Sequence, residues 1–162
     1  CFRFGPSTNI TRSVFEMYEI DDKKDFSNAI VGKKIDSTYL IKSLFEHANN
    51  GDLPAISVLE TSGEHMARSI AGVIKELNIK EPINVILAGS VWAKATNFAM
   101  LNKFKKVVCE LSNKKCNFIV LKEPPVLGAI LWALELANGE LPDKELKAKV
   151  LENIINYQNS IN

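Results

Sequence analysis

The stretch ILAGSVWAK, residues 86–94, places a glycine and a serine directly after a short apolar run. Glycine lets a ligand approach the backbone closely, and the Ser90 hydroxyl could bond to a ribose, a base or a phosphate. The same pattern is also typical of a tight turn between a strand and a helix, with Trp92 filling the core. Gly89 and Ser90 are therefore candidates for a binding loop, and Trp92 is a candidate wall of a pocket.

A second unusual stretch is KEPPVLGAILWALELANG, residues 122–139. Pro125 suits the first turn of a helix, where its missing N–H costs nothing. Gly128 and Ala129 leave that turn without bulk, so we expect a second helix or a nucleotide to lie close to it. Helix packing alone would explain the pair equally well.

The three cysteines, Cys1, Cys109 and Cys116, form no CxxC pair and no cluster with metal-ligand spacing. An odd count favours a reducing compartment over a disulfide framework. Cys109 and Cys116 flank an expected helix end and strand start. We do not expect either one to be a reactive thiol.

His47 and His65 lie on predicted helices, and no Ser or Cys is spaced to suggest a catalytic triad with them. We interpret both as surface or packing residues. The turn GPSTN, residues 5–9, offers a glycine, hydroxyls and backbone N–H groups that could bind phosphate. A surface turn would have the same composition.

The overall composition is that of an ordinary globular protein. The chain has 162 residues, of which 46% are hydrophobic and 24% charged, and one domain is expected. Its net charge of +1 gives no electrostatic reason to expect binding to nucleic acid or to an anionic membrane. The longest apolar stretch, Val126 to Ala137, is too short to span a bilayer, and no signal peptide is recognised. We therefore expect a cytoplasmic protein. Because the chain opens without Met, we expect it to be part of a longer one.

These candidate residues require elements to position them, and residues 1–36 are the hardest part to interpret. CFRF could be a short strand, SVFEMYEI a helix, and DDKKDFSN a solvated connection. We treat 1–36 as an uncertain lead-in and 37–162 as the domain.

From Ser37 onward the periodicity predicts a helix capped by Ser37 that ends at Asn50-Gly51. Asp52 then caps a long helix with Pro54 in its first turn. Its small residues Gly63, Ala67, Ala71 and Gly72 would permit close approach of another helix. Its larger apolar residues recur at a spacing of three and four and are expected to face inward: Ile56, Leu59, Met66, Ile70, Val73, Ile74 and Leu77.

The remainder alternates strands and helices. INVILAG (83–89) and CNFIVLK (116–122) read as strands buried on both faces. A helix covers much of 94–113 between them, with Phe98, Leu101, Phe104, Val108 and Leu111 inward. A helix from the proline pair to about Ala137 follows, and an amphipathic helix covers 143–158. The fold class is therefore α/β, with few parallel strands flanked by helices and a right-handed crossover.

Three stretches occur in one order: ANNGDLPAISVLETSGEHMARSIAGVIKEL, then NVILAGSVWAK, then EPPVLGAILWAL. Together they resemble the C-terminal domain of actin-like-fold sugar kinases, over about residues 44–138. The resemblance is nearest to the N-acetylglucosamine kinase and benzoyl-CoA-reductase-type (BadF-BadG-BcrA-type) ATPase group. The repressor/kinase (ROK) group and the hexokinases are more distant relatives. The resemblance implies part of a ribonuclease H-like (actin-like ATPase) domain.

It also implies that Ala88, Gly89, Ser90 and Val91 form the adenosine-contacting loop. Family members usually carry Gly-Gly where this chain has Ala88-Gly89 or Gly89-Ser90. ATP and Mg²⁺ are the implied cofactors, and Gly128 would be a packing glycine near the site. No catalytic residue is assigned, and no protein-held metal is expected.

The function implied is the nucleotide-side half of an ATP-dependent kinase for a hexose or N-acetylhexosamine. The family's two phosphate loops, Asp-x-Gly-x-Thr-like and Gly-Thr-Gly-Ser-like, do not occur in the sequence. This polypeptide alone is therefore not expected to be a competent kinase, because phosphoryl transfer needs a held triphosphate and a base. The sugar would be held by a half that the chain lacks. The alternatives are a non-catalytic actin-like module that binds or regulates, and an activator ATPase. Homodimerisation is left open.

Overall fold

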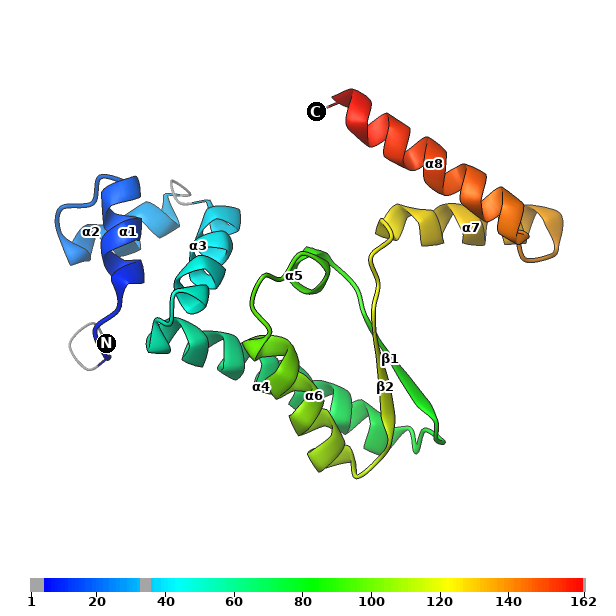
Figure 1. The fold of residues 1–162 in the computed structure, drawn as a ribbon, viewed down its shortest axis with the longest axis horizontal. Helices are drawn as coiled ribbons and strands as arrows, with labels where there is room; N and C mark the ends of the chain where they lie inside the picture. The colour runs from blue at the N-terminus through cyan, green and yellow to red at the C-terminus, as the bar shows by residue number, and fades with distance from the viewer. Residues whose placement is uncertain (1–4, 33–35, 162) are drawn as a thin grey trace. The chain divides into compact units, whose positions relative to one another are not determined.

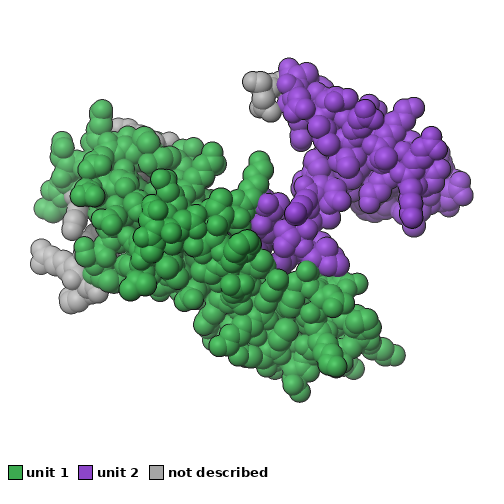
Figure 2. Space-filling view, in the orientation of Figure 1, with its two compact units in different colours: residues 1–85, 94–118 green, residues 86–93, 119–162 purple. Residues whose placement is uncertain are grey.

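The computed structural model describes residues 5–32 and 36–161. These residues form two compact units, shown in green and purple in Figure 2. The first unit comprises residues 1–85 and 94–118, and the second comprises 86–93 and 119–162. The strand expected at CFRF lies outside the described residues.

The first unit opens with two short helices, α1 (Asn9–Met17) and α2 (Lys23–Val31). Thr8 caps α1, because its side chain accepts a hydrogen bond from the N–H of Ile10 at 3.2 Å. The expectation of a solvated connection at DDKKDFSN is wrong. Asp22 accepts a bond from the N–H of Lys24 at 2.9 Å, and the Phe26 ring packs 5.7 Å from that of Phe15. One local cap and one aromatic contact therefore stabilise a helix that the charged composition conceals.

Helix α3 (Ser37–Asn49) begins one residue away from the expected cap. The side chain of Asp36, and not that of Ser37, accepts the capping bond, from the N–H of Thr38 at 2.8 Å. The hydroxyl of Tyr18 accepts a bond from the N–H of Asp36 at 3.0 Å, which ties the start of α3 to the end of α1. The expected end at Asn50-Gly51 is confirmed, since Gly51 has a φ of +82°.

Helix α4 (Leu53–Glu76) is capped by Asp52 and has Pro54 in its first turn, as expected. It packs along α6 (Ala99–Ser112), and Figure 1 shows the two running side by side. The expected inward positions Met66, Val73 and Leu77 are wrong, because these side chains are 42%, 50% and 66% exposed. The buried stripe of α4 consists mostly of small residues: Ala55, Leu59, Gly63, Ala67, Ala71 and Ile74. Small side chains bring the two backbones together, and larger ones are turned outward.

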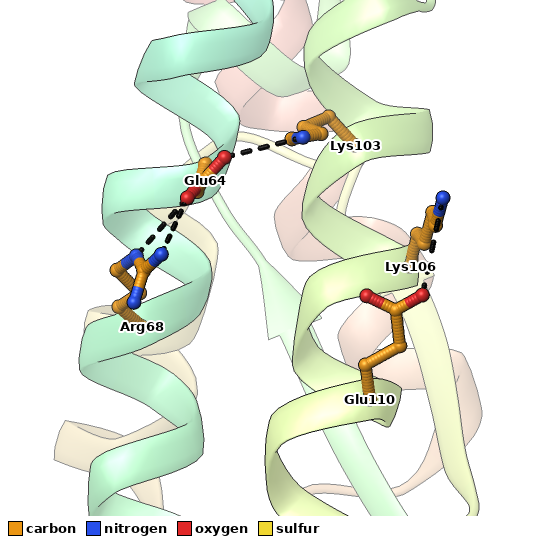
Figure 3. A network of polar contacts seen from close by, with 5 residues as sticks. All are labelled: Glu64, Arg68, Lys103, Lys106 and Glu110. Carbon is orange, nitrogen blue, oxygen red and sulfur yellow. Dashed lines mark hydrogen bonds and ion pairs between the residues drawn. The ribbon is translucent and has the colours of Figure 1, made fainter.

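A charged cluster links the exposed edges of these two helices, as Figure 3 shows. Glu64 of α4 bonds to Arg68 one turn later at 2.6 Å and reaches Lys103 of α6 at 3.2 Å. The Arg68 and Lys103 bonds lower the pKa of the Glu64 carboxyl. Lys106 and Glu110 form a looser pair at 3.9 Å on α6 alone. Solvent screens all of these pairs, so they contribute little to stability. The Glu64–Lys103 pair helps to align α4 with α6.

The helix expected over much of 94–113 is confirmed by α6, although α6 begins later than residue 94. A short helix, α5 (Ser90–Ala93), is followed by a turn, and α6 begins at Ala99. The side chain of Asn97 accepts a bond from the N–H of Ala99 at 2.9 Å and donates one to Asn49 at 3.0 Å. Asn49 in turn donates to Thr96 at 3.0 Å. Phe98, which was expected to be buried, is 63% exposed as a result.

Strands β1 (Ile83–Leu87) and β2 (Cys116–Val120) pair in a two-stranded parallel sheet. The N–H of Ile83 bonds to the carbonyl of Lys115, and that of Leu121 bonds to the carbonyl of Leu87. This register sets Asn84 opposite Asn117, and their side chains bond at 3.3 Å. Burial on both faces was expected and is wrong among the described residues. Ile83, Val85 and Leu87 are buried, whereas Ile86 is 54% and Ile119 is 44% exposed on the other face.

The second unit contains the helices α7 (Pro125–Asn138) and α8 (Lys144–Ile161), which contact each other. The expected start at Pro125 and end at Asn138-Gly139 are confirmed, and Gly139 has a φ of +77°. Leu127 is buried, but Trp132 and Leu136 of the same helix are 66% and 72% exposed. Among the described residues, no helix is long and apolar enough to cross a bilayer.

Candidate functional site

The loop of Ala88, Gly89, Ser90 and Val91 leaves the carboxyl end of β1 and enters α5 directly. Gly89 has a φ of +107°, a conformation that side chains rarely adopt. Its carbonyl accepts bonds from the N–H groups of Trp92 at 3.1 Å and Ala93 at 3.0 Å. The sharp turn from strand to helix therefore depends on glycine at this position.

This loop is open to solvent. Ala88, Gly89 and Ser90 are exposed, and Val91 is partly buried. A side-chain carbon placed on Gly89 would meet nothing within 4 Å. Glycine is thus required by the backbone conformation, and the space above it is free to admit a ligand. Ser90 and Val91 lie in the first helical turn, where backbone N–H groups have no partner within the helix.

The carboxyl end of β2 lies beside this loop, because the N–H of Leu121 bonds to the carbonyl of Leu87 at 2.9 Å. The chain then passes through Lys122 and Glu123 to Pro124, whose carbonyl accepts a bond from the N–H of Leu127 at 2.9 Å. Loops from two neighbouring parallel strands therefore leave the same edge of the sheet. In open α/β sheets this edge is where ligands bind.

The close neighbour expected at Gly128 is not found among the described residues. A side-chain carbon added to Gly128 would meet nothing within 4 Å, and Ala129 is exposed. The interpretation of Gly128 as a packing glycine is therefore wrong within the described chain. The proline pair determines where α7 begins, and the small residues after it leave an open surface.

The Asp52 carboxylate links two helices of the first unit through several hydrogen bonds. It accepts bonds from the Thr8 hydroxyl at 2.9 and 3.1 Å, from the N–H of Asn9 at 2.9 Å and from the N–H of Ala55 at 3.0 Å. Burial raises the pKa of Asp52, but the bonds from Asn9, Ala55 and Thr8, with nearby His47, outweigh it and lower the pKa overall. The carboxylate joins the starts of two helices and has a structural role.

His47 forms another link between helices of the first unit, since its Nε2 lies 3.0 Å from the Ser13 hydroxyl. The pair connects α3 to α1, in agreement with the interpretation of His47 as a packing residue. Sequence spacing could not reveal this neighbour, because the two residues belong to different helices. His65 is exposed on α4.

The turn GPSTN contributes to a shallow concavity of about 820 Å³ at the N-terminal end of the described chain. Arg12 lies in its lining with three acidic residues, Glu16, Glu19 and Asp21. Arg12 lies 3.8 Å from Glu16, and Thr8 is bonded to Asp52. This acidic balance does not favour a phosphate. No group of three or more metal-ligating side chains occurs among the described residues.

Comparison with known families gives a clear result. Residues 27–135 match the model of the ROK family, and the chain belongs to that family. The family is part of the actin-like ATPase superfamily and includes sugar kinases and transcriptional repressors. Its sugar kinases generally use ATP and Mg²⁺.

The match confirms the actin-like superfamily expected from the motifs and leaves the finer assignment untested. The sequence resemblance ranks the ROK group among the more distant relatives, and the match does not assign the chain to the N-acetylglucosamine kinase and BadF-type group. No curated protein and no solved structure matches the chain.

Proposed function

We propose that this chain supplies the nucleotide side of an ATP-dependent kinase that phosphorylates a hexose or an N-acetylhexosamine. Family membership supports a kinase-like domain of the actin-like superfamily. The finer assignment depends on the loop of Ala88, Gly89, Ser90 and Val91, which would contact adenosine. Residues 37–162 would form this nucleotide-side domain.

The observation that carries the proposal is the conformation of Gly89. It turns the chain at the carboxyl end of a parallel strand with a φ of +107°, and no described residue lies within 4 Å of a side-chain carbon added to it. A purely structural turn would tolerate a neighbouring side chain packed over the glycine. An open glycine at this sheet edge fits the close approach of a flat ligand to the backbone.

Each residue of the loop would have a distinct role. Ala88 and Gly89 would let the ligand contact the main chain, and the Ser90 hydroxyl would bond to the ribose or the base. The partly buried Val91 would contact the apolar face of the base. ATP supplies the transferable phosphoryl group, and Mg²⁺ would be carried by the triphosphate, since the described residues offer no ligand cluster for the ion.

Catalysis would need groups from outside this chain. Neither of the family's phosphate loops occurs in the 162 residues, and no general base is identified. In kinases the protein positions the triphosphate and the acceptor hydroxyl and contributes little covalent chemistry. This chain would supply adenosine binding, while the sugar and the phosphates would be held by the missing half.

A second function is a non-catalytic module that binds or regulates. The Ala88-Gly89 pair, which replaces the usual Gly-Gly, favours it. The ROK family itself includes transcriptional repressors. An activator ATPase has less support, because the cysteine pattern does not suggest ligands for a cluster.

The partners proposed for this function are a nucleotide and a sugar. No nucleic acid or membrane partner is proposed, and homodimerisation is left open. A cytoplasmic location is part of the proposal, because the substrates of such a kinase are cytoplasmic.

Calorimetric titration of the full chain with ATP·Mg²⁺ and with ADP tests the proposal. Gly89→Trp should abolish binding, because an indole would occupy the open space and strain the turn. Gly139→Trp is a matched control, since Gly139 also has a positive φ (+77°) and open surroundings but lies away from the loop. Equal loss in both variants, or absence of binding to the unmodified chain at millimolar nucleotide, would refute an adenosine site at residues 88–91.

A further inference from the structure

Two thiols of the first unit lie on consecutive elements. Cys109 is in the last turn of α6, and Cys116 is the first residue of β2. Both are free, Cys109 being exposed and Cys116 partly exposed. Their separation matches no metal-ligand or redox motif, so the sequence pattern alone gives them no role.

The chain reverses between these two residues. Asn113 ends α6 in the left-handed conformation with a φ of 54°, and its N–H bonds to the carbonyl of Cys109 at 3.0 Å. Aromatic contacts show that β2 returns along α6. The Phe118 ring lies 5.9 Å from the Phe104 ring, and the Lys105 ammonium lies 5.9 Å from the Phe118 ring.

This antiparallel return places the thiols side by side. Cys109 follows Lys105 by one helical turn, about 6 Å along the axis. Cys116 precedes Phe118 by two strand residues on the same face, roughly 6.6 Å in the matching direction. We therefore infer that Cys109 lies at the same level as Cys116, as Lys105 lies at the level of Phe118.

The electrostatic environment agrees with this placement. Burial raises the pKa of the Cys116 thiol, and the electrostatic effect of the Cys109 thiol raises it further. The Glu81 carboxylate, which accepts a bond from the N–H of Lys115, acts in the same direction. Cys116 is thus held as a thiol beside the more accessible Cys109.

We propose that Cys109 and Cys116 are an oxidation site that forms an intramolecular disulfide when the protein meets a peroxide. The Cys109 thiolate attacks one oxygen of hydrogen peroxide, the O–O bond breaks, and sulfenic acid and water form. The sulfur of Cys116 then attacks the sulfenic sulfur, the S–S bond forms and a second water leaves. In sum, two thiols lose two protons and two electrons, and one peroxide becomes two waters.

The geometry also indicates what the bond would do. It would close the short turn from Asn113 to Lys115 and join the end of α6 covalently to the start of β2. A disulfide needs Cα atoms about 4.4–6.8 Å apart, which adjacent helix and strand positions can provide. A nearby resolving thiol would also protect Cys109 from irreversible oxidation to sulfinic acid.

The test treats the folded chain, carrying Cys1→Ser to remove the third thiol, with stoichiometric hydrogen peroxide. After alkylation and trypsin digestion, mass spectrometry should find the peptide of residues 107–114 joined to that of residues 116–122, lighter by about two hydrogens than the sum of the reduced peptides. Dithiothreitol should separate them. The same reaction in concentrated urea should be at least about tenfold slower, because folding holds the thiols together.

Single substitutions distinguish the pair from two independent thiols. In Cys116→Ser, Cys109 should progress to sulfinic acid, whereas with Cys116 present it should stop at the disulfide. Recovery of Cys116 as an alkylated thiol beside over-oxidised Cys109 in the parent chain would overturn the proposal. Equal rates of cross-linking in folded and urea-denatured chains would also overturn it.

Discussion

The backbone of Gly63 on α4 lies directly against the main-chain carbonyl of Met100 on α6. A side-chain carbon at Gly63 would overlap the Met100 oxygen and would lie 3.1 Å from its carbonyl carbon. Main-chain atoms cannot turn aside as a flexible side chain can. The absence of a side chain at Gly63 therefore allows α4 and α6 to approach this closely.

Gly63→Ala should destabilise the protein despite the better helix propensity of alanine. Overpacking of this kind costs about 1–3 kcal/mol, against a propensity gain of about 1 kcal/mol. Urea unfolding followed by circular dichroism measures the difference. Gly72→Ala on the same helix is the matched control, because Gly72 is exposed with nothing within 4 Å of an added carbon. It should stabilise by about 0.5–1 kcal/mol, and equal effects at both sites would contradict the close approach.

Asp52→Ala should cost more than the loss of an ordinary helix cap. Removing a cap costs about 1 kcal/mol, and this substitution also leaves the Thr8 hydroxyl and the Asn9 N–H without their acceptor. Asp36→Ala is the comparison, since the Asp36 side chain accepts a bond from the N–H of Thr38 within its own helix. In thermal unfolding, Asp52→Ala should have a lower Tm than Asp36→Ala. The reverse order would show that the link from Thr8 to Asp52 adds nothing.

The lowered pKa of Asp52 predicts a specific dependence of stability on pH. Its folded-state pKa lies below the ordinary value of 3.8, so the ionised carboxylate stabilises the folded state. This contribution is complete above the unfolded-state value and is lost as the pH falls through the lower folded-state value. At about pH 6 the free energy of unfolding should therefore be larger for the unmodified chain than for Asp52→Asn. This difference should shrink below about pH 4. A difference that stays constant over this range would contradict the assigned role.

Two apolar positions on α7 should respond very differently to truncation. Leu127 is 4% exposed, whereas Trp132 is 66% exposed. Leu127→Ala should cost about 2–5 kcal/mol, because it removes buried methyl groups and leaves a cavity. Trp132→Ala should stay within about 0.5 kcal/mol, as expected for a surface substitution. Unfolding midpoints in denaturant measure both changes in stability. A large loss of stability in Trp132→Ala would mean that this face of α7 is covered.

The sequence predicted element types well where a local signal was sufficient. Asp52 with Pro54 correctly marked the start of α4, and Asn138-Gly139 the end of α7, because caps and positive-φ glycines act over a few residues. The helix expected over much of 94–113 is present as α6, but its start at Ala99 was not predicted, because that start depends on bonds between Asn97 and Asn49, which are distant in the chain. The inward face of α4 was misjudged for a related reason. Apolar periodicity favoured large residues such as Met66, which is exposed, whereas Gly63 and Ala67 are buried, as expected for small residues that permit close helix approach.

The candidate site shows the same division. A turn at Gly89 could be predicted, since a glycine after a β-branched run is a strong local signal. Its φ and its open surroundings required the fold. The proximity inferred for Cys109 and Cys116 could not be predicted from the sequence, because it depends on how β2 returns along α6.

Nuclear magnetic resonance of the ¹⁵N-labelled full chain, titrated with ATP·Mg²⁺, tests the central claim most directly. The account predicts that the amide resonances of Ala88, Gly89, Ser90 and Val91 shift together in a saturable manner, while that of Gly139 does not move. If these four resonances stay unchanged at millimolar nucleotide, or if shifts occur only at other positions, the loop after β1 is not an adenosine site.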